Sequence, residues 1–321
     1  MASKGLRVLV LAGGPDRERE VSLVGGGQVA GALREAGHEV IQRDVMPDDL
    51  SALDEFKRWN GDVIFPVLHG RWGEGGGLQR ELSNRDLAYV GSGPAAASLC
   101  INKHLTKRPV AEHGVQTPAS QLLLPGQARQ LEAPVVVKAL EEGSTIGLRI
   151  CKTDAEADEA CEVLSRDYPR LLVERYVPGK ELTVGVIAAD PETDAAQDPA
   201  ALPVLQIIPA GECYDYDAKY ERDDTRYLFD IDLPNETPQR VRDWSLTAYR
   251  VLGVRHLCRV DFMVDTFDRP WFIEANTMPG FTTHSLLPMA AARAGLSLSQ
   301  LCDRMVRLAR AGVDVGDVIT G

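Results

Sequence analysis

Two alternating runs near the C-terminus constrain the fold of this chain more than any other feature. His256–Asp265 (HLCRVDFMVD) and Arg269–Asn276 (RPWFIEAN) both read as β-strands, and the linker between them has the length of a hairpin loop. Successive side chains of a strand point to opposite faces. In the first run, one face is therefore apolar and the other carries Arg259 and Asp261. The chain is expected to contain an antiparallel hairpin with one buried and one polar face.

The polar face of this predicted hairpin is acidic. Alternation places Glu274 and Asn276 on one face of the second strand and Trp271 and Ile273 on the other. Symmetric closure places Asp261 roughly opposite Glu274, and because like charges opposite one another destabilise a sheet, a cation should lie between them. Carboxylate and amide oxygens suit Mg²⁺ or Mn²⁺, completed by substrate phosphates. A solvated face with scattered charges explains these residues about equally well.

The N-terminal part alternates strands and helices. Strands are predicted at Leu6–Ala12, His38–Val45 and within DVIFPVLHG, with a helix at about Arg19–Ala36. This order indicates a parallel sheet with helices on both faces.

The chain is long enough for two or three domains, because 321 residues exceed an ordinary single domain. AYVGSGPAAASLC is rich in small residues and is expected to connect the first unit to the second. The second unit carries the strands APVVVKAL and LLVERYV. The polar segment GECYDYDAKYERDDTRYLFD predicts a long loop of the lid type. Helices of the last unit are predicted at about Gln239–Leu252, Leu287–Ala294 and Ser297–Ala311.

Charge and cysteine content exclude several classes of partner. Thirty-five basic and forty-seven acidic residues give a net charge of -12, which repels polyphosphate backbones and argues against nucleic acid. The apolar run LRVLVLAGG is too short to cross a bilayer and is read as a buried strand, so neither a signal peptide nor a membrane segment is expected. The six cysteines form no CxxC pair, as is typical of thiols in a reducing cytoplasm.

A glycine-bounded loop follows a β-branched strand in VVVKALEEGSTIG. Lys138 ends the strand, and Gly143–Gly147 follow shortly after. Backbone N–H groups of such a loop can bind phosphate oxygens, while the lysine supplies a positive charge. The lysine precedes the glycines, so this is not a Walker A loop. A surface lysine beside an ordinary turn is the plainer alternative.

The segment VERYVPGKE indicates a hinge between domains. Glu174 and the backbone near Val177 would meet the edge of a base, and Glu181 would take ribose hydroxyls. Taken alone, a strand followed by a Pro-Gly turn explains this segment better.

Two N-terminal segments place carboxylates beside turns. AGGPDREREVSLVGG lacks G-x-G-x-x-G, so a dinucleotide loop is rejected. Glu18 at the predicted helix start suits a substrate ammonium, or it simply complements the helix dipole. HGRWGEGGGLQ places His69 and Glu74 on a glycine-rich loop, although its glycines are also explained by turns alone.

Taken together, these segments resemble the D-alanine:D-alanine ligase family of the ATP-grasp superfamily. The resemblance runs from about Val8 to Met305 and rests on six motifs in the family's order, namely GGPDREREVSL, HGRWGEGGGLQ, KALEEGSTIG, VERYVPGKELTV, YDYDAKY and RVDFMVD…FIEANTMPGFTTHSLLP. It implies an α/β fold of three-domain ATP-grasp architecture, with α+β character in the ATP-grasp part. The implied domains are an N-terminal parallel-sheet substrate domain (1–97), a central ATP-grasp subdomain (98–180), and a C-terminal ATP-grasp subdomain with the metal site and lid loop (181–321).

The resemblance also implies roles for individual residues. ATP would be bound by Lys103, Lys138, Gly143, Ser144, Thr145, Gly147, Glu174, Val177 and Glu181. Two Mg²⁺ or Mn²⁺ ions would be ligated by Asp261, Glu274 and Asn276. The catalytic residues would be Glu18, Ser144, Tyr220, Arg259, Gly280 and Ser285. The substrates would be bound by Glu18, His69, Lys219, Ser285 and Leu286.

The implied reaction joins two D-alanines for peptidoglycan synthesis. The γ-phosphate of ATP converts the first D-alanine, held by Glu18, into an acyl phosphate. The second D-alanine, whose carboxylate is received by Lys219, then attacks. Arg259 and the backbone N–H of Gly280 stabilise the oxyanion, and ADP and phosphate are released. Tyr220 would join Ser144 and Glu18 in pinning the lid. The family also implies a cytoplasmic homodimer.

Five positions depart from the family's usual wording. They are Asp16, Gly75, Asn102, Ala139 and Thr145. None is an implied metal ligand or oxyanion donor, so the departures concern the phosphate loop and the packing around the first substrate more than the reaction.

Two alternatives remain open at this stage. A sister ligase would join D-alanine to D-lactate or D-serine, but Tyr220 after Lys219 favours the dipeptide. A nucleotide-binding regulatory protein without turnover would lack a metal ligand or a lysine, and none is missing here.

Overall fold

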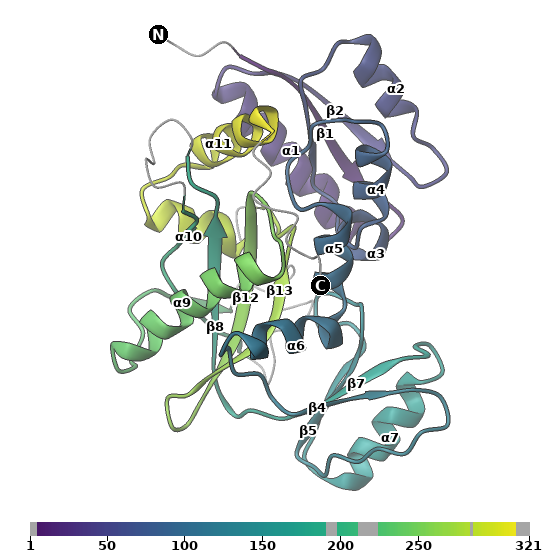
Figure 1. Cartoon of the computed structure of the whole chain (residues 1–321), viewed down its shortest axis with the longest axis vertical. Helices are drawn as coiled ribbons and strands as arrows, with labels where there is room; N and C mark the ends of the chain where they lie inside the picture. The colour runs from purple at the N-terminus through teal and green to yellow at the C-terminus, as the bar shows by residue number, and fades with distance from the viewer. Residues whose placement is uncertain (1–4, 191–197, 211–223, 283–284, 313–321) are drawn as a thin grey trace.

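The computed structural model describes residues 5–190, 198–210, 224–282 and 285–312, which form three sheets with helices packed against them (Figure 1). The first sheet is parallel, and the other two pair their strands antiparallel. This arrangement confirms the predicted α/β class with a parallel N-terminal sheet. No helix in the described part of the chain is both long and apolar enough to cross a bilayer.

The first sheet has the strand order β2-β1-β3. Its elements are β1 (Arg7–Gly13), α1 (Arg19–Glu35), β2 (Glu39–Val45), α2 (Ser51–Arg58), β3 (Val63–Pro66), α3 (Gly70–Gly73) and α4 (Gly77–Ser83). Both faces of β1 are covered, because Val8 and Val10 pack in one core while Leu9 and Leu11 pack in another. A continuous apolar run is the pattern expected of a strand buried on both sides.

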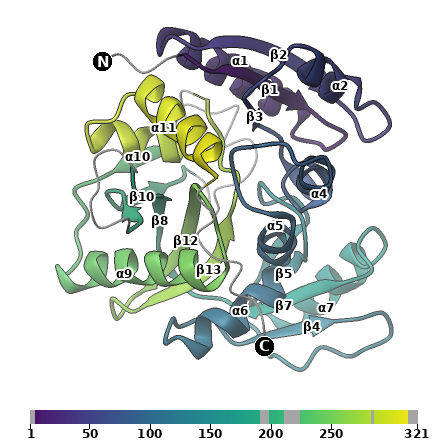
Figure 2. The same ribbon diagram turned by 45° about the horizontal axis from the view of Figure 1, so that its top comes forward.

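The last two helices of the chain complete the first of these cores. They are α10 (Leu286–Arg293) and α11 (Leu298–Ala311). Met305 of α11 packs in the same cluster as Val8 and Val10, and Figure 2 shows α11 next to α1. The two ends of the sequence therefore share one hydrophobic core.

Helix α1 contains three consecutive glycines, Gly25–Gly27, although glycine costs a helix roughly 1 kcal/mol relative to alanine. An added Cβ at Gly26 would lie 2.6 Å from the Cβ of Ala12 on β1, whereas one at Gly27 would meet no atom within 4 Å. Gly26 therefore allows the helix to approach the strand, and Gly27 has no such role.

These contacts predict opposite effects for two neighbouring substitutions. Gly27→Ala is expected to raise the free energy of unfolding by about 0.5–1 kcal/mol, because it restricts the unfolded chain and improves helix propensity. Gly26→Ala is expected to lower it by about 1–3 kcal/mol through overpacking. Urea denaturation of the two variants measures both values, and stabilisation by both substitutions would show that helix propensity alone governs this stretch.

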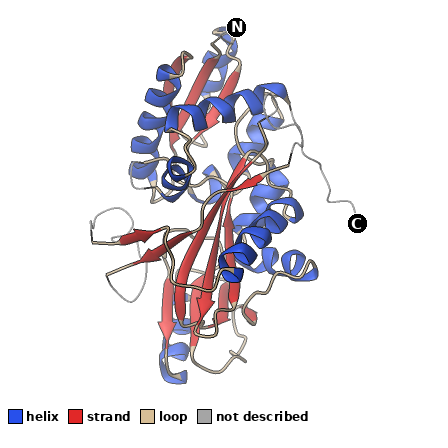
Figure 3. Ribbon diagram, turned by 90° about the vertical axis from the view of Figure 1, so that its left-hand side faces the viewer, coloured by secondary structure: helices blue, strands red, loops and turns tan. Residues whose placement is uncertain are grey.

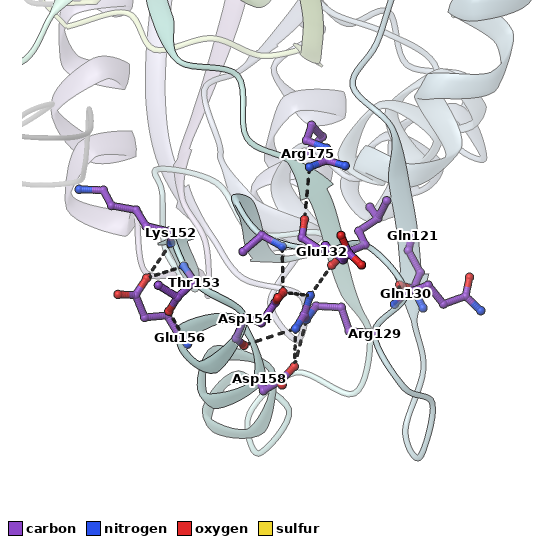
Figure 4. A network of polar contacts seen from close by, with 12 residues as sticks. Gln121, Arg129, Gln130, Glu132, Lys152, Thr153, Asp154, Glu156, Asp158 and Arg175 are labelled. Atoms are coloured by element: carbon purple, nitrogen blue, oxygen red, sulfur yellow. Dashed lines mark hydrogen bonds and ion pairs between the residues drawn. The ribbon is translucent and has the colours of Figure 1, made fainter.

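The second sheet has the order β4-β7-β5-β6. Its elements are β4 (Ser120–Leu123), β5 (Val135–Ala139), β6 (Leu148–Cys151), α7 (Asp154–Leu164) and β7 (Leu171–Arg175). Helix α7 begins with a capping box between Thr153 and Glu156. Arg129 lies between Asp154 and Asp158 and ties the preceding loop to this helix (Figure 4).

The third sheet has the order β11-β10-β8-β12-β13, and β9 pairs with β8. Its elements are β8 (Gly179–Ile187), β9 (Ala200–Ala201), β10 (Leu205–Ile208), β11 (Arg226–Leu228), α9 (Glu236–Val251), β12 (Leu257–Asp265) and β13 (Pro270–Asn276). Figure 3 shows the long strands of this sheet side by side, running through the middle of the molecule. Its core includes Val184, Val260, Phe262 and Phe272.

Two sequence expectations need correction. The small-residue segment before residue 102 is not only a connection, because Pro94–Ile101 forms helix α5, which begins with proline at its first turn and packs Ala96 and Ala97 inward. The predicted long loop over 211–230 contains strand β11. This is a short edge strand whose two end residues are exposed, so the strand can be polar in sequence. Residues 211–223 lie outside the described residues.

The domain limits 97/98 and 180/181 stay a prediction. Two hydrophobic cores contain residues from both sides of these limits. Helices α5 and α6 (Lys103–Glu112) supply Cys100 and Val110 to the core of the third sheet. Helix α11 packs against α1 and β3 of the first sheet, and α10 packs against β8 of the third sheet within the same core.

Candidate active site

The hairpin of β12 and β13 brings the predicted acidic residues together in the predicted register. Asp261 pairs with Glu274, and Arg259 pairs with Asn276. Two cations offset the repulsion between the carboxylates. Arg259 donates to Asp261 through Nε (2.9 Å to Oδ1) and Nη2 (2.7 Å to Oδ2), and Lys103 Nζ lies 3.2 Å from Glu274 Oε2. The hairpin therefore presents a platform of alternating charge.

The predicted placement of Trp271 and Ile273 on the opposite face is wrong. A β-bulge makes Ile273 an extra residue, so that Phe272 pairs with Phe262 while Glu274 pairs with Asp261. Phe272 therefore faces the core, and Ile273 and Glu274 both line the adjacent cavity. Bulges re-aim side chains in this way beside functional sites.

A cavity of about 390 Å³ is walled by strands of the second and third sheets. The predicted residues that line it are Lys103, Lys138, Gly143, Ser144, Thr145, Glu174, Val177, Glu181, Arg259, Asp261, Glu274 and Leu286. Glu18, His69, Gly147, Asn276, Gly280 and Ser285 are not among its lining residues. Lys219 and Tyr220 lie outside the described residues.

The predicted phosphate loop connects β5 to β6 and is held closed by its own backbone. Ala139 N donates to Gly147 O at 2.9 Å, and Ile146 N donates to Gly143 O at 3.0 Å. Ser144 and Thr145 have φ values of +48° and +63°, which side chains other than glycine rarely adopt and which costs of order 1–3 kcal/mol each. Such strain is typical of ligand-binding loops.

The loop is also tied to the N-terminal unit. Ser144 Oγ donates to Glu18 Oε1, across 126 positions of sequence, and Glu18 immediately precedes α1 and is buried. An added Cβ at Gly143 would lie 3.0 Å from Glu18 Oε2, so glycine leaves this carboxylate its space. The predicted association of Glu18 with Ser144 is thus present as a contact.

Glu18 belongs to a buried group of ionisable side chains with His69 and Glu74. Burial lowers the pKa of His69, the charge of Arg259 lowers it further, and the charge of Glu18 opposes both. His69 Nε2 has no hydrogen-bond partner within the described part of the chain. Neutral His69 therefore offers an acceptor or donor to a group bound beside Glu18.

Glu74 makes the free energy of unfolding depend on pH. Burial first, and then the charge of Glu18, raises its pKa from 4.5 to about 8, although Gly70 N donates to Oε1 at 3.1 Å. Between these pH values the folded protein holds a proton that the unfolded chain has released. The resulting stabilisation is present below about pH 4.5 and is lost as the pH rises through 8.

Glu74→Gln should remove this dependence. The free energy of unfolding of the variant relative to the wild type is expected to rise by several kcal/mol, as an order of magnitude, between pH 5 and pH 8.5. Denaturant titrations of both proteins across this range give the difference. Parallel curves would show that Glu74 is not protonated in the folded protein.

Gly280 and Ser285 lie side by side at the start of α10. An added Cβ at Gly280 would be 2.7 Å from Ser285 Oγ, which accepts a hydrogen bond from Thr282 N at 2.9 Å. Both predicted residues therefore lie close to Leu286, which lines the cavity.

Two polar contacts in the site were not foreseen. Thr183 Oγ1 donates to Asp261 Oδ1 at 2.6 Å, and both side chains are buried. Thr183 follows Glu181 by two positions on β8, so the alternation of the strand could have placed it on the same face. Lys107 contacts Glu174 from α6, one turn after Lys103, a spacing that puts both lysines on one side of the helix.

The donor set of the hairpin fits a divalent cation that is shared with phosphate oxygens. Asp261 and Glu274 supply carboxylates, and Asn276 Oδ1 is oriented by a hydrogen bond from Met278 N at 3.0 Å. Among the described residues, no group of three or more His, Cys, Asp or Glu side chains could hold a metal ion. Mg²⁺ commonly takes only one or two carboxylates from the protein and completes its shell with water and phosphate.

Comparisons with known proteins agree on one family. A family model described as D-ala D-ala ligase C-terminus matches residues 112–307. A D-alanine–D-alanine ligase of Bordetella petrii is 40% identical over 306 residues, covering 94% of this chain and 91% of that protein. The ligase of Dechloromonas aromatica is 38% identical over 314 residues, covering 96% of this chain and 99% of that protein.

Solved structures give the same result. The crystal structure of a D-alanine–D-alanine ligase from Bacillus anthracis has a TM-score of 0.81 and 29% identity, covering 95% of this chain and 97% of that one. A second structure of that enzyme, complexed with ATP, has a TM-score of 0.79 and 26% identity with the same coverage. The chain therefore belongs to the D-alanine–D-alanine ligase family.

Proposed function

We propose that this chain joins two D-alanines to D-alanyl-D-alanine, through a D-alanyl phosphate, with release of ADP and phosphate. The observation that carries the proposal is the convergence of Lys103, Lys138 and Arg259 with Asp261 and Glu274 around one cavity. Lys138 and Asp261 are buried and the other three are partly buried. Opposite charges gathered in this way, in a chain of this family, are suited to phosphoryl transfer onto a carboxylate. The product supports peptidoglycan synthesis.

The cavity has the residues to hold ATP at both ends. Glu174 and Val177, beside the hinge between β7 and β8, face the base, and Glu181 faces the ribose. Lys103 and Lys138 provide two positive charges for the phosphates, a preorganised arrangement that is worth most where water is excluded. The loop Gly143–Gly147 covers the phosphates with its backbone N–H groups.

Asp261, Glu274 and Asn276 would hold Mg²⁺ or Mn²⁺. An ion held there would supply positive charge that offsets the charge of the phosphates. Arg259 lies beside Asp261. Together with the N–H of Gly280, it would bind the oxyanion of the tetrahedral intermediate.

The remaining residues bind and protect the amino acids. Glu18 takes the ammonium of the first D-alanine, and His69 orients groups next to it. Ser285 and Leu286 receive the carboxylate of the second together with Lys219, while Tyr220 joins Glu18 and Ser144 in closing the site. Lys219 and Tyr220 are outside the described residues. We further propose that the protein is a cytoplasmic homodimer.

Phosphate release with ATP and Mg²⁺ tests the proposal. D-alanine alone is expected to support release and to yield D-alanyl-D-alanine by mass spectrometry, whereas L-alanine alone should not. Mixtures with D-lactate or D-serine should still give mainly the dipeptide. A mixed ester or a serine product would instead identify a sister ligase, and ATP binding without release would favour a nucleotide-binding regulatory protein.

A further inference from the structure

A buried ion cluster lies between the cavity and helix α6. Glu174, on β7, accepts from two lysines at once, from Lys138 at 2.7 Å through Oε2 and from Lys107 through Oε1. All three side chains are buried, with 2%, 4% and 5% exposure for Glu174, Lys138 and Lys107. One carboxylate thus compensates two ammonium groups in a region of low dielectric.

The two lysines approach Glu174 from different sides. Lys138 lines the cavity together with Glu174, but Lys107 does not. Lys107 instead lines a second groove, on the α6 side, and donates to Thr117 Oγ1 at 2.8 Å. Figure 1 shows α6 at the junction between the lower ends of β12 and β13 and the sheet that contains β4, β5 and β7. Lys107 therefore contacts Glu174 from the side that faces away from the cavity.

We propose that Lys107 is a positioning residue. It keeps Glu174 ionised and fixed in place when Lys138 binds the phosphates of a nucleotide. The inference rests on the proposed function, in which Glu174 meets the base. An ionised carboxylate is an acceptor only, so it selects a base that presents an amino group at this edge. Lys107 would thereby set the selectivity of the site for adenine.

The cost of burying an unpaired carboxylate explains why Glu174 has a second lysine that does not contact the phosphates. A buried carboxylate that loses its partner is strongly destabilised, so a single lysine shared with phosphates would leave Glu174 poorly compensated. Burial alone would raise the pKa of Glu174, but the charges of Lys138 and Lys107 outweigh it and hold the pKa below its ordinary value. Lys107 is not exposed to the cavity, and phosphates there do not compete for it.

Lys107→Met tests the inference without reference to ligation. Calorimetry with Mg²⁺ measures the affinity for ATP and for purine riboside triphosphate, which lacks only the 6-amino group. The wild type should prefer ATP by about 10–100-fold, the range of a hydrogen bond to a charged group. In the variant, affinity for ATP should fall about 10-fold or more, affinity for the analogue should change far less, and the preference should approach unity.

The Glu174→Gln background separates positioning from general structure. If Lys107 acts through Glu174, adding Lys107→Met to this background should leave the remaining preference unchanged within about twofold. Thr117→Val, which removes the other partner of Lys107, serves as the matched control and should keep the preference of the wild type. Equal weakening of ATP and the analogue by Lys107→Met, or a full effect in the Glu174→Gln background, would overturn the inference.

A milder variant covers a failure of Lys107→Met to fold. Lys107→Gln can still donate to Glu174 but carries no charge, and it should also lose the preference for ATP. A preference equal to that of the wild type would refute a role for the charge. Because only binding is measured, a chain that selects ATP but does not ligate D-alanine would overturn the proposed function and leave this inference standing.

Discussion

Asp261→Asn is expected to lower kcat by about 10²–10³-fold, the cost of removing one charged group from a preorganised phosphoryl-transfer site. This carboxylate makes three kinds of contact. It faces Glu274 across the hairpin, it binds Arg259 through both oxygens, and it accepts from Thr183. The amide has the same shape but no charge, so it weakens both the hold on a divalent cation and the orientation of Arg259.

Metal affinity gives a readout that does not depend on turnover. Binding of Mn²⁺ in the presence of ADP, followed by electron paramagnetic resonance, should weaken at least about 10-fold in Asp261→Asn. Asp265→Asn is a suitable control, because Asp265 lies on the same strand with the same exposure of 9% but binds Arg269 and Trp271 instead. The control should cost stability while leaving Mn²⁺ affinity and kcat near those of the wild type. Equal loss of Mn²⁺ affinity in both variants would show that the strand, and not Asp261, is responsible.

The hairpin illustrates what a sequence can predict about such a site. Side chains repeat every two residues along a strand, so the polar face of β12 and the pairing of Asp261 with Glu274 followed from alternation and loop length. The bulge at Ile273 did not, because an extra residue in one strand depends on hydrogen bonds that leave no mark in the order of polar and apolar residues. One residue sufficed to exchange the predicted faces of Trp271 and Phe272.

Contacts between distant segments were predictable only where a motif implied them. The approach of Ser144 to Glu18 followed from the family resemblance, since nothing in either segment alone points to the other. Lys107 carried no motif of its own. Its regular spacing from Lys103 placed it on the same side of α6, but its contact with Glu174 depends on how α6 packs between two sheets. The roles of the site residues stay predictions until the variants are measured.

The shared core of the two chain ends is a further feature that local patterns did not reveal, and Phe281 is its most informative member. The side chain is fully buried, and its ring meets that of Phe65 on β3 edge to face, with centroids 5.3 Å apart. Phe281 packs in one cluster with Val8 of β1 and Met305 of α11. It also directly follows Gly280, whose backbone N–H is the proposed oxyanion donor.

Phe281→Ala is therefore expected to lower the free energy of unfolding by about 3–5 kcal/mol, through lost burial and the cavity left behind. Phe267→Ala is the matched control, because Phe267 is 75% exposed at the tip of the hairpin and its removal should change stability by no more than about 0.5 kcal/mol. Under conditions where both variants are folded, Phe281→Ala should also reduce kcat by about 10-fold or more, since a small displacement of a catalytic donor is costly. A stability loss below about 1 kcal/mol would mean that the packing of the C-terminal helices on the N-terminal sheet does not depend on this contact. A full stability loss with unchanged kcat would show that this core does not control the position of Gly280.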